Sequence, residues 1–269
     1  MTTAVAPLPA SATRGKLLST ASDISVVVVR NLLRYVRQPQ LLVFTVIQPV
    51  MFVLLFRYVF GGAISVPGFN YVDFLMPGII VQSIAFGTAG TSVGLAEDIA
   101  NGMIDRFRSL PMARSAVLAG RTLADTLRTA FTILLMGGVG ALVGFRIHTD
   151  LLHMLVAVVL CLYFAMAFSW IAATIGLSVT SPEAAQTGGF VWLFPVTFAS
   201  SAFVPVQTMP SWLQHIANAN PITLTVNAAR ALTLGGPTDP VLYQALAWVT
   251  GIMLVFGPLA IRRYRRMSS

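Results

Sequence analysis

Residues Leu151–Val179 read LLHMLVAVVLCLYFAMAFSWIAATIGLSV, a run of 29 residues without aspartate, glutamate, lysine or arginine. A helix needs roughly 20 mainly apolar residues to cross about 30 Å of hydrocarbon, where it satisfies its own backbone hydrogen bonds. The run is therefore predicted to be a membrane-spanning helix. Because it is longer than one crossing needs, we expect it to tilt or to extend beyond the bilayer.

Five further runs of the same kind lie on either side of this one. They are Leu41–Phe60, Leu75–Ala96, Thr129–Phe145, Gln186–Val206 and Val241–Ile261. The run that starts at Thr129 is short, so its helix is expected to begin a turn earlier, near Asp125, with Arg128 reaching to the membrane interface. The predicted fold class is an all-α membrane protein with six transmembrane helices, in a transmembrane domain over residues 39–263.

The composition agrees with this class and excludes a water-soluble enzyme. Of the 269 residues, 56% are hydrophobic and 10% are charged, and the mean hydropathy is +0.80. A soluble domain carries about 25% charged residues, so this chain has too few to cover a surface that faces water. The single cysteine, Cys161, excludes an internal disulfide framework and a cysteine-based zinc site.

The basic residues predict the orientation of the bundle. Fourteen of the 17 lie before the first run, between the second and third runs, or after the sixth. The other three, Arg57, Arg146 and Arg230, lie on the opposite side. Because basic residues mark cytoplasmic flanks, both termini are expected to be cytoplasmic. The net charge of +8 is then a topology signal, and no nucleic-acid partner is expected.

The amino-terminal segment is predicted to contain a helix that lies in the membrane interface. In residues 23–38, DISVVVVRNLLRYVRQ, the three arginines share a narrow stripe opposite a broad apolar face, and Pro39 ends the pattern. The alternative is a partly buried helix of a soluble domain. Residues 1–22 are expected to be a disordered cytoplasmic tail, because MTTAVAPLPASAT lacks the basic start and apolar region of a signal peptide. Residues 264–269 are expected to be a second tail.

The segment between the second and third runs is the largest predicted cytoplasmic element between crossings. It begins with EDIANGMIDRFRSLPMAR at Glu97–Arg114, in which Gly102 gives a flexible point and Pro111 interrupts a helical pattern. Beyond it, the spacings of Arg121 with Asp125 and of Asp125 with Arg128 allow pairs on one helix face. Two interpretations stay open: a solvated loop whose charges do nothing specific, or an amphipathic element that docks into the groove of a partner.

Two short helices are predicted before the sixth run, on the outer side. Asn220-Pro221 is typical of a helix start and Gly235-Gly236 of a helix end, which gives a helix of about 14 residues that is too short to span. A second short helix is expected over Pro210–Ala219, with Trp212 suited to the headgroup region. The pair is either a re-entrant element that narrows an exit or a purely structural cap.

Several local patterns resemble catalytic or metal-binding motifs, but a structural role is the better interpretation of each. Gly90–Gly94 matches the G-x-S-x-G pattern of a serine nucleophile at Ser92, but the three histidines are predicted on the other side of the membrane, and small residues at this spacing favour close helix packing. His148, Asp150 and His153 lack a fourth metal ligand, so no metal site is expected. Without a phosphate-binding loop, and with Lys16 as the only lysine, the chain is not expected to have an ATPase site of its own.

The residues predicted near the middle of the membrane are neutral and partly aromatic. Gln48, Gln82, Phe86 and Phe198 are the candidates for a path that takes a large, mostly apolar cargo. No acidic residue, lysine or histidine lies near the middle of any run, which disfavours a proton- or ion-coupled carrier. The alternatives left open are a secondary multidrug carrier, an intramembrane serine hydrolase and a scaffold without transport.

The whole organisation resembles the type-2 ABC exporter permeases, and most closely their daunorubicin/doxorubicin-resistance branch. The resemblance extends from about Asp23 to Arg263. It rests on the string at Glu97–Arg114 and on MPSWLQHIANANPIT at Met209–Thr223, followed by Ala229-Arg230. It implies a permease subunit, in a bacterial inner membrane, of an ATP-driven exporter for a hydrophobic drug-like or lipid-like substrate.

The resemblance also implies partners and site residues. A separate nucleotide-binding ATPase subunit would hold ATP and Mg, and two permeases, identical or different, would pair in the membrane. Coupling to the ATPase is implied for residues 97–114, namely Glu97, Asp98, Ile99, Gly102, Met103, Asp105, Arg106, Phe107, Arg108 and Pro111. An external helical hairpin near the exit is implied for residues 210–234, with Pro210, Trp212, Asn220, Pro221 and Arg230.

Overall fold

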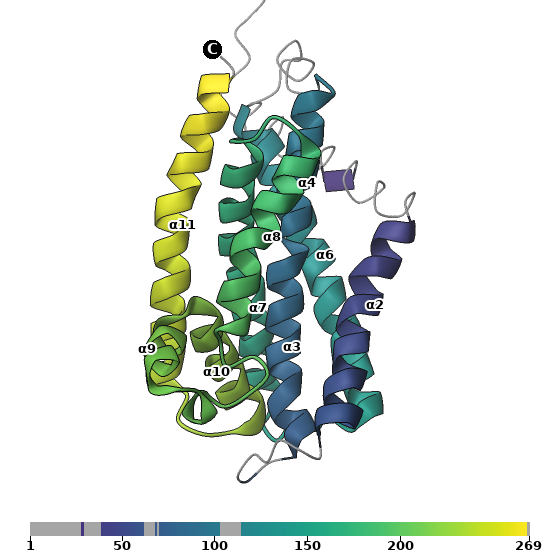
Figure 1. The fold of residues 1–269 in the computed structure, drawn as a ribbon, viewed down its shortest axis with the longest axis vertical. Helices are drawn as coiled ribbons and strands as arrows, with labels where there is room; N and C mark the ends of the chain where they lie inside the picture. Colours follow the sequence, from purple (N-terminus) through teal and green to yellow (C-terminus); the bar gives the residue numbers. More distant parts are fainter. Residues whose placement is uncertain (1–27, 30–38, 62–67, 69, 103–113, 268–269) are drawn as a thin grey trace, which may run out of the picture.

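The fold is a bundle of helices, in a computed structural model that describes residues 28–29, 39–61, 68, 70–102 and 114–267 (Figure 1). The elements are α2 (Pro39–Leu55), the π-helical turn η1 (Phe56–Phe60), α3 (Tyr71–Gly87), α4 (Ala89–Ala100), α6 (Arg114–Val143), α7 (Leu151–Gly176), α8 (Pro182–Phe198), the 3-10 turn η2 (Val206–Thr208), α9 (Ser211–Ala219), α10 (Pro221–Leu234) and α11 (Asp239–Met267). These described parts contain no β-strand. Most of the predicted interfacial helix 23–38 and the tail 1–22 lie outside them.

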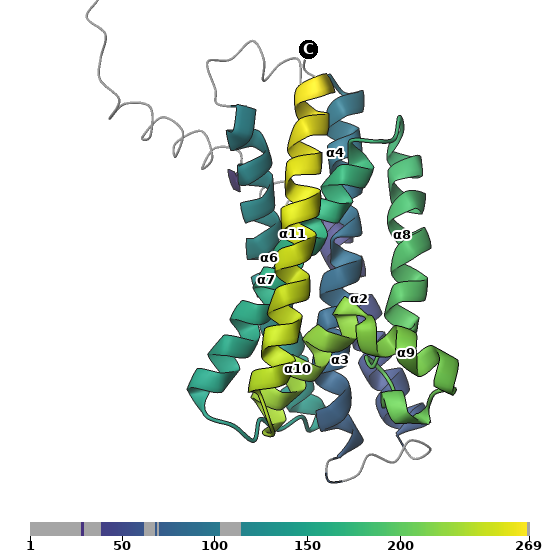
Figure 2. The ribbon, with the colours of Figure 1, turned by 90° about the vertical axis from the view of Figure 1, so that its left-hand side faces the viewer.

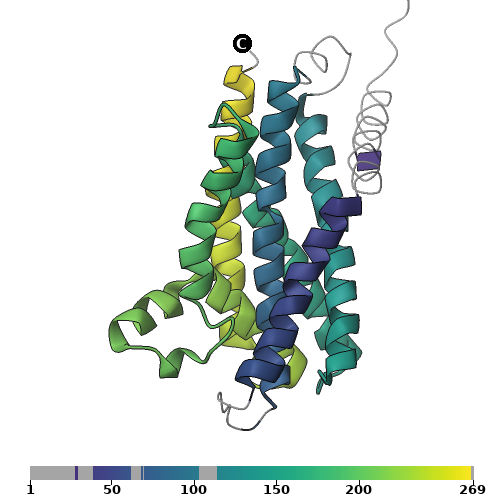
Figure 3. The ribbon, with the colours of Figure 1, turned by 45° about the vertical axis from the view of Figure 1, so that its right-hand side comes forward.

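The long helices run side by side along one axis, and the short ones gather at one end. Figures 1 and 2 show α9 and α10 at the end of the bundle opposite the carboxyl terminus, where α3 begins and α8 ends. Helix α7 lies at the centre and packs against α4, α6, α10 and α11, with Phe164 and Phe168 fully buried. Figure 3 shows α2 on the outside of the bundle, where it packs against α3 and α6.

Four of the predicted crossings coincide with helical segments that are long and apolar enough to span a membrane. They are Tyr71–Ala100, Gly120–Val143, Leu151–Gly176 and Asp239–Tyr264. The described apolar part of the first run, Ile47–Phe60, and α8, with 17 residues, are shorter. The all-helical membrane class is thus confirmed, while the count of six crossings stays a prediction.

Three helix boundaries differ from the prediction. Helix α8 ends at Phe198 although its run extends to Val206. At this end the side-chain amide of Asn220 donates hydrogen bonds to the carbonyl oxygens of Val196 and Ala199, at 2.6 and 2.9 Å, in place of a further helical turn. Helix α6 begins at Arg114 and not near Asp125, and in its first half Arg121 and Asp125 make polar contacts with α4. Helix α11 continues to Met267, into the expected tail.

The spanning segment Tyr71–Ala100 is interrupted at Thr88, between α3 and α4. The Thr88 hydroxyl donates to the carbonyl oxygen of Ala85 at 2.6 Å, and the Arg128 guanidinium donates to that of Gly87 at 2.9 Å. From the sequence we expected the Arg128 side chain to reach to the membrane interface, and this stays a prediction. Arg128 crosses from α6 to satisfy a carbonyl at the interruption, where the regular helical pattern is lost.

Candidate functional site

Polar side chains join α4 to α6 at the end of the bundle where the 97–114 segment leaves α4. The Arg121 guanidinium lies 2.7 Å from the Asp98 carboxylate, and these side chains are only 10% and 16% exposed. One turn deeper in α6, the Asp125 carboxylate accepts a hydrogen bond of 2.7 Å from the Thr91 hydroxyl. Arg121 and Asp125 are buried, so these two charges are not solvated; for residues 97–114 the choice between a solvated loop and a docking element stays open.

The 97–114 segment begins in the last turn of α4. Ile99 packs beside a cluster that includes Leu95 of α4 and Tyr264 of α11. Gly102 has a φ of +66°, and its N–H donates to the carbonyl oxygen of Ile99 at 3.0 Å, which ends the helix in a conformation that favours glycine. The other predicted coupling residues lie outside the described residues; they are Met103, Asp105, Arg106, Phe107, Arg108 and Pro111.

A series of phenylalanines forms a continuous chain of ring contacts across α3, α8 and α2. We call it the aromatic series; its members are Phe86, Phe190, Phe194, Phe198, Phe203, Phe52, Phe56 and Phe60. Ring centroids lie 5.0 Å apart for Phe86 and Phe194, and 6.1 Å for Phe194 and Phe198. Phe194 and Phe198 are 48% and 50% exposed. The series thus offers aromatic surface beginning near the middle of the Tyr71–Ala100 span.

Of the four residues predicted to line a cargo path, the structure brings two together. Phe86 and Phe198 both contact Phe194 and belong to the aromatic series. Gln82 is buried at 3% exposure, one turn before Phe86 in α3. Gln48 is exposed on α2. Sequence reasoning missed Phe190 as a member, although its spacing of four residues from Phe194 places both on one face of a helix.

The two short helices predicted before the sixth run are present as α9 and α10. Asn220 is the N-cap of α10: its side-chain oxygen accepts from the Ile222 N–H at 2.9 Å, and Pro221 occupies the first helical position. Pro210 directly precedes α9, where Trp212 is 66% exposed and Ala217 is buried. Local start signals placed both helices correctly.

Arg230 of α10 is buried and holds three parts of the chain together. Its guanidinium donates to the carbonyl oxygens of Phe74 in α3 (2.8 Å) and of Ser201 (2.7 Å) and Ala202 (3.2 Å) after α8. It also donates to the Ser201 hydroxyl, and its central carbon lies 3.4 Å from the centre of the Phe74 ring. All these partners are neutral, so Arg230 acts as a multiple hydrogen-bond donor that fixes α10 to α3.

The histidines that the sequence predicted for the outer side are engaged in structural contacts. His148 lies 3.3 Å from the buried carboxylate of Asp73, which also accepts from the Arg146 N–H at 2.8 Å. Asp150 caps α7 by accepting from the His153 N–H at 3.2 Å, and hydrogen bonds from His153 hold the pKa of Asp150 below its ordinary value. No group of three potential ligands that could hold a metal ion occurs among the described residues. Asp73 was missed in the sequence because nothing local marks its burial.

Ser92 lies inside α4 and is fully buried, with its hydroxyl donating to the carbonyl oxygen of Ala185 at 3.3 Å. A G-x-S-x-G nucleophile requires a strand-to-helix turn and a histidine base, and the helix gives it neither. His148 contacts Asp73, and Asp73 lies 19 residues before Ser92 along α3 and α4, about 28 Å at 1.5 Å per residue. This histidine is therefore far from Ser92. Close packing is found at Ser92, where a Cβ added to Gly176 of α7 would lie 2.5 Å from the Ser92 carbonyl oxygen, whereas Gly90 is exposed and a Cβ added to it would meet no atom within 4 Å.

Comparison with known proteins identifies the family. A family described as ABC-2 type transporter matches residues 22–234. The daunorubicin resistance ABC transporter permease protein DrrB1 of Streptomyces coeruleorubidus is 34% identical over 240 residues, which cover 89% of this chain and 85% of that protein. The probable doxorubicin resistance permease DrrC of Mycobacterium tuberculosis is 27% identical over 242 residues, covering 89% and 87%. The putative transport permease ycf38 of Cyanophora paradoxa is 25% identical over 214 residues, covering 78% and 73%. The chain therefore belongs to the ABC-2 type transporter family.

Proposed function

We propose that this chain is the permease subunit of an ATP-driven exporter for a hydrophobic, drug-like or lipid-like molecule. A separate ATPase subunit supplies the energy, and two permeases, identical or different, pair in a bacterial cytoplasmic membrane. Each permease crosses six times, with both termini in the cytoplasm. The family match and the names of the relatives support the class, and the half-exposed rings of Phe194 and Phe198 in the aromatic series support the chemistry of the cargo.

The observation that carries the proposal is the polar connection between α4 and α6. The 97–114 segment lies between these helices in sequence, and the Asp98–Arg121 ion pair holds them together where the segment leaves α4. Ile99 packs near Tyr264, so α11 is in contact with the same end of α4. A partner that pushes on the segment would therefore move α4, α6 and α11 together. This is the arrangement a coupling element needs.

The aromatic series provides the surface on which an apolar cargo can move. Aromatic rings bind flat, apolar molecules by burying large areas and by offset or edge-on contacts. In α8 the rings of Phe194 and Phe198 are exposed, and the ring of Phe86 in α3 lies beside that of Phe194. This aromatic surface begins near the middle of the membrane. In the proposed assembly α3 and α8 flank the cargo path at the contact between the two permeases, and the α9–α10 hairpin stands at its outer end.

The test is reconstitution of the permease in vesicles with and without the ATPase encoded next to it. We expect the two subunits to purify together, and we expect efflux of a hydrophobic fluorescent dye only with ATP and both subunits. Deleting residues 99–110 is expected to abolish both the association and the efflux. Association and efflux that persist after this deletion would contradict the coupling role of the segment.

A proton-coupled carrier is the second candidate, and one observation favours keeping it in the test. Asp125 lies buried within the span Gly120–Val143, so a titratable group does occur inside a crossing. Its hydrogen bond to Thr91 suits a structural role equally well. Efflux driven by a proton gradient without ATP, and lost in Asp125→Asn, would favour the carrier over the ATP-driven exporter.

A further inference from the structure

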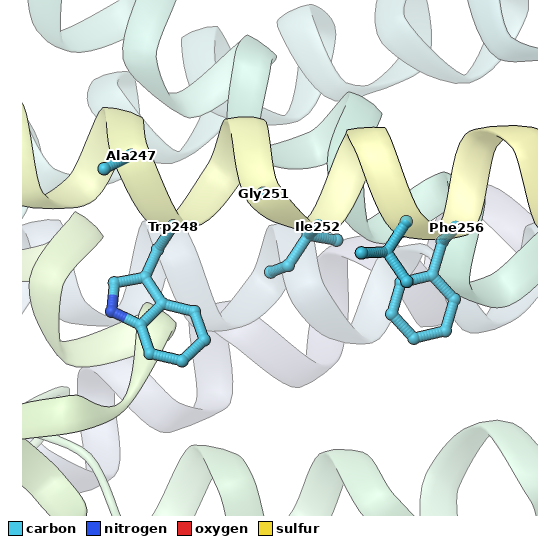
Figure 4. Close-up of a pocket in the computed structure, with 6 residues that line it drawn as sticks. Ala247, Trp248, Gly251, Ile252 and Phe256 are labelled. Atoms are coloured by element: carbon cyan, nitrogen blue, oxygen red, sulfur yellow. The ribbon is translucent and has the colours of Figure 1, made fainter.

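Helix α11 carries an apolar groove that the transport proposal does not use. The groove has a volume of about 460 Å³ and is lined by Ala247, Trp248, Gly251, Ile252, Val255 and Phe256. Trp248, Ile252 and Phe256 point to the same side of the helix (Figure 4). Every residue of the lining is apolar or glycine, so the groove suits a hydrocarbon chain and offers nothing to a polar ligand.

The groove lies at the depth of the hydrocarbon core. Gly251 is the midpoint of the apolar run Val241–Ile261, within the candidate span Asp239–Tyr264. Gly251 is exposed, and a Cβ added to it would meet no atom within 4 Å. The hollow is therefore open toward the surroundings of the bundle, which at this depth are lipid.

The same face of α11 ends in arginines. With 3.6 residues per turn, Arg266 lies five turns after Trp248, and Arg262 and Arg263 fall within about 60° of that direction. All three arginines are exposed, and α11 contains no acidic residue after Asp239. Arg262 follows Gly251 by 11 residues, about 16 Å along the helix. This is about half the 30 Å thickness of the hydrocarbon core, so the arginines reach headgroup level.

We propose that this face of α11 binds an anionic phospholipid of the leaflet at the carboxyl-terminal end of the bundle. One acyl chain lies in the groove at Gly251, and the phosphate is bound by Arg262, Arg263 and Arg266. Guanidinium groups bind phosphate oxygens with two parallel hydrogen bonds. Arg263 also donates to the Ser178 hydroxyl, which brings the end of α7 beside the headgroup. The lipid is a bound component and not the cargo.

The test measures lipid retention by the purified full chain without ATP, using native mass spectrometry after exchange into phosphatidylglycerol or phosphatidylcholine. The wild-type chain is expected to retain phosphatidylglycerol preferentially. Since each basic residue near a membrane surface adds to the attraction for anionic lipid, the triple variant Arg262→Gln/Arg263→Gln/Arg266→Gln is expected to lower that retention at least about tenfold. Gly251→Leu, which fills the groove, is expected to lower retention of both lipids.

Gly138→Leu on α6 is the matched control, because Gly138 is also exposed and has no atom within 4 Å of an added Cβ. This variant is expected to retain both phosphatidylglycerol and phosphatidylcholine as the wild type does. Equal retention of the two lipids by the wild type, or unchanged retention in the triple variant or in Gly251→Leu, would overturn the proposal. So would disulfide-linked dimers of Gly251→Cys in vesicles, which would place a second copy of the chain on the groove. Because no step needs ATP or cargo, a failure of the transport proposal leaves this result interpretable.

Discussion

The carboxylate of Asp98 lies 2.7 Å from the guanidinium of Arg121, and this pair connects the end of α4 to the polar half of α6. Both side chains are largely buried, at 16% and 10% exposure. Removing one partner of a buried ion pair leaves the other charge without compensation. The pair is therefore a sensitive point for the stability of this end of the bundle and for its proposed coupling role.

Asp98→Asn and Arg121→Gln are each expected to lower the free energy of unfolding by about 3 kcal/mol, the low end for a broken buried pair. ATP-driven efflux is expected to fall with it. The exchanged pair Asp98→Arg/Arg121→Asp is expected to recover part of both. Thermal unfolding in detergent and dye efflux measure the two effects, and an exchanged pair no better than the single variants would refute the direct interaction.

Gly78 marks a close contact between α3 and the segment after α8. A Cβ at Gly78 would lie 1.9 Å from the carbonyl oxygen of Ala202. Gly78→Ala is expected to destabilise the fold by about 1–3 kcal/mol, because one backbone must move away from the other. Gly138→Ala, at an open position in α6, is expected to stabilise slightly through its higher helix propensity. If Gly78→Ala and Gly138→Ala shifted the melting temperature in the same direction, the close contact at Gly78 would be contradicted.

Arg230 tests whether hydrogen-bond geometry or charge alone fixes α10 to α3. Arg230→Lys keeps the charge but has three donors and no planar fork. We expect it to leave buried carbonyl oxygens such as those of Phe74 and Ala202 unsatisfied, each at a cost of about 1–3 kcal/mol. Arg146→Lys, at an exposed position of the same end, is the control and should melt like the wild type. Equal melting temperatures for Arg230→Lys and Arg146→Lys would mean that charge alone is sufficient to fix α10 to α3.

The aromatic series gives a prediction that separates transport from stability. Phe194→Ala and Phe198→Ala remove half-exposed rings, so we expect efflux of an aromatic dye to fall while thermal stability changes little. Phe168→Ala removes a fully buried ring and is expected to cost about 3–5 kcal/mol. Leu142→Ala, 90% exposed on α6, controls for loss of apolar surface away from the series. Unimpaired dye efflux in Phe194→Ala/Phe198→Ala would exclude the series as a cargo surface.

Ser92 allows a direct test of the hydrolase alternative. Ser92→Ala removes one hydrogen bond of 3.3 Å to Ala185 and leaves the close packing with Gly176 in place. Such a hydrogen bond contributes about 1 kcal/mol, so we expect nearly unchanged stability and full ATP-driven efflux. Loss of efflux with normal folding would reopen a chemical role for this serine.

The features that were predictable from the sequence are those whose signals are local. Asn220-Pro221 and Gly235-Gly236 placed α10 correctly, because capping residues act within one helical turn. The apolar runs also predicted the long helices, because the length of an apolar run can be read directly from consecutive residues. The end of α8 was missed because its cause, the amide of Asn220, lies more than twenty residues away in sequence.

The candidate site was less predictable because its members meet only through tertiary packing. The spacing of Arg121 and Asp125 pointed to partners within one helix, whereas the structure adds Asp98 and Thr91 on α4. The spacing of Phe194 and Phe198 on α8 is readable from the sequence, but the contact of Phe86 in α3 with Phe194 arises from packing between helices. The burial of Arg230 was likewise invisible, since most of its acceptors are backbone carbonyls that no sequence pattern records.

The amide of Asn220 restricts which residue this position can accept. Its oxygen receives the N–H of Ile222 at the start of α10, while its nitrogen donates to Val196 and Ala199 at the end of α8. Serine, threonine and ionised aspartate can cap a helix start as acceptors, yet none carries an amide that donates twice. A position that looks interchangeable among capping residues therefore favours asparagine, which alone among them can cap α10 and donate hydrogen bonds to the end of α8 at the same time.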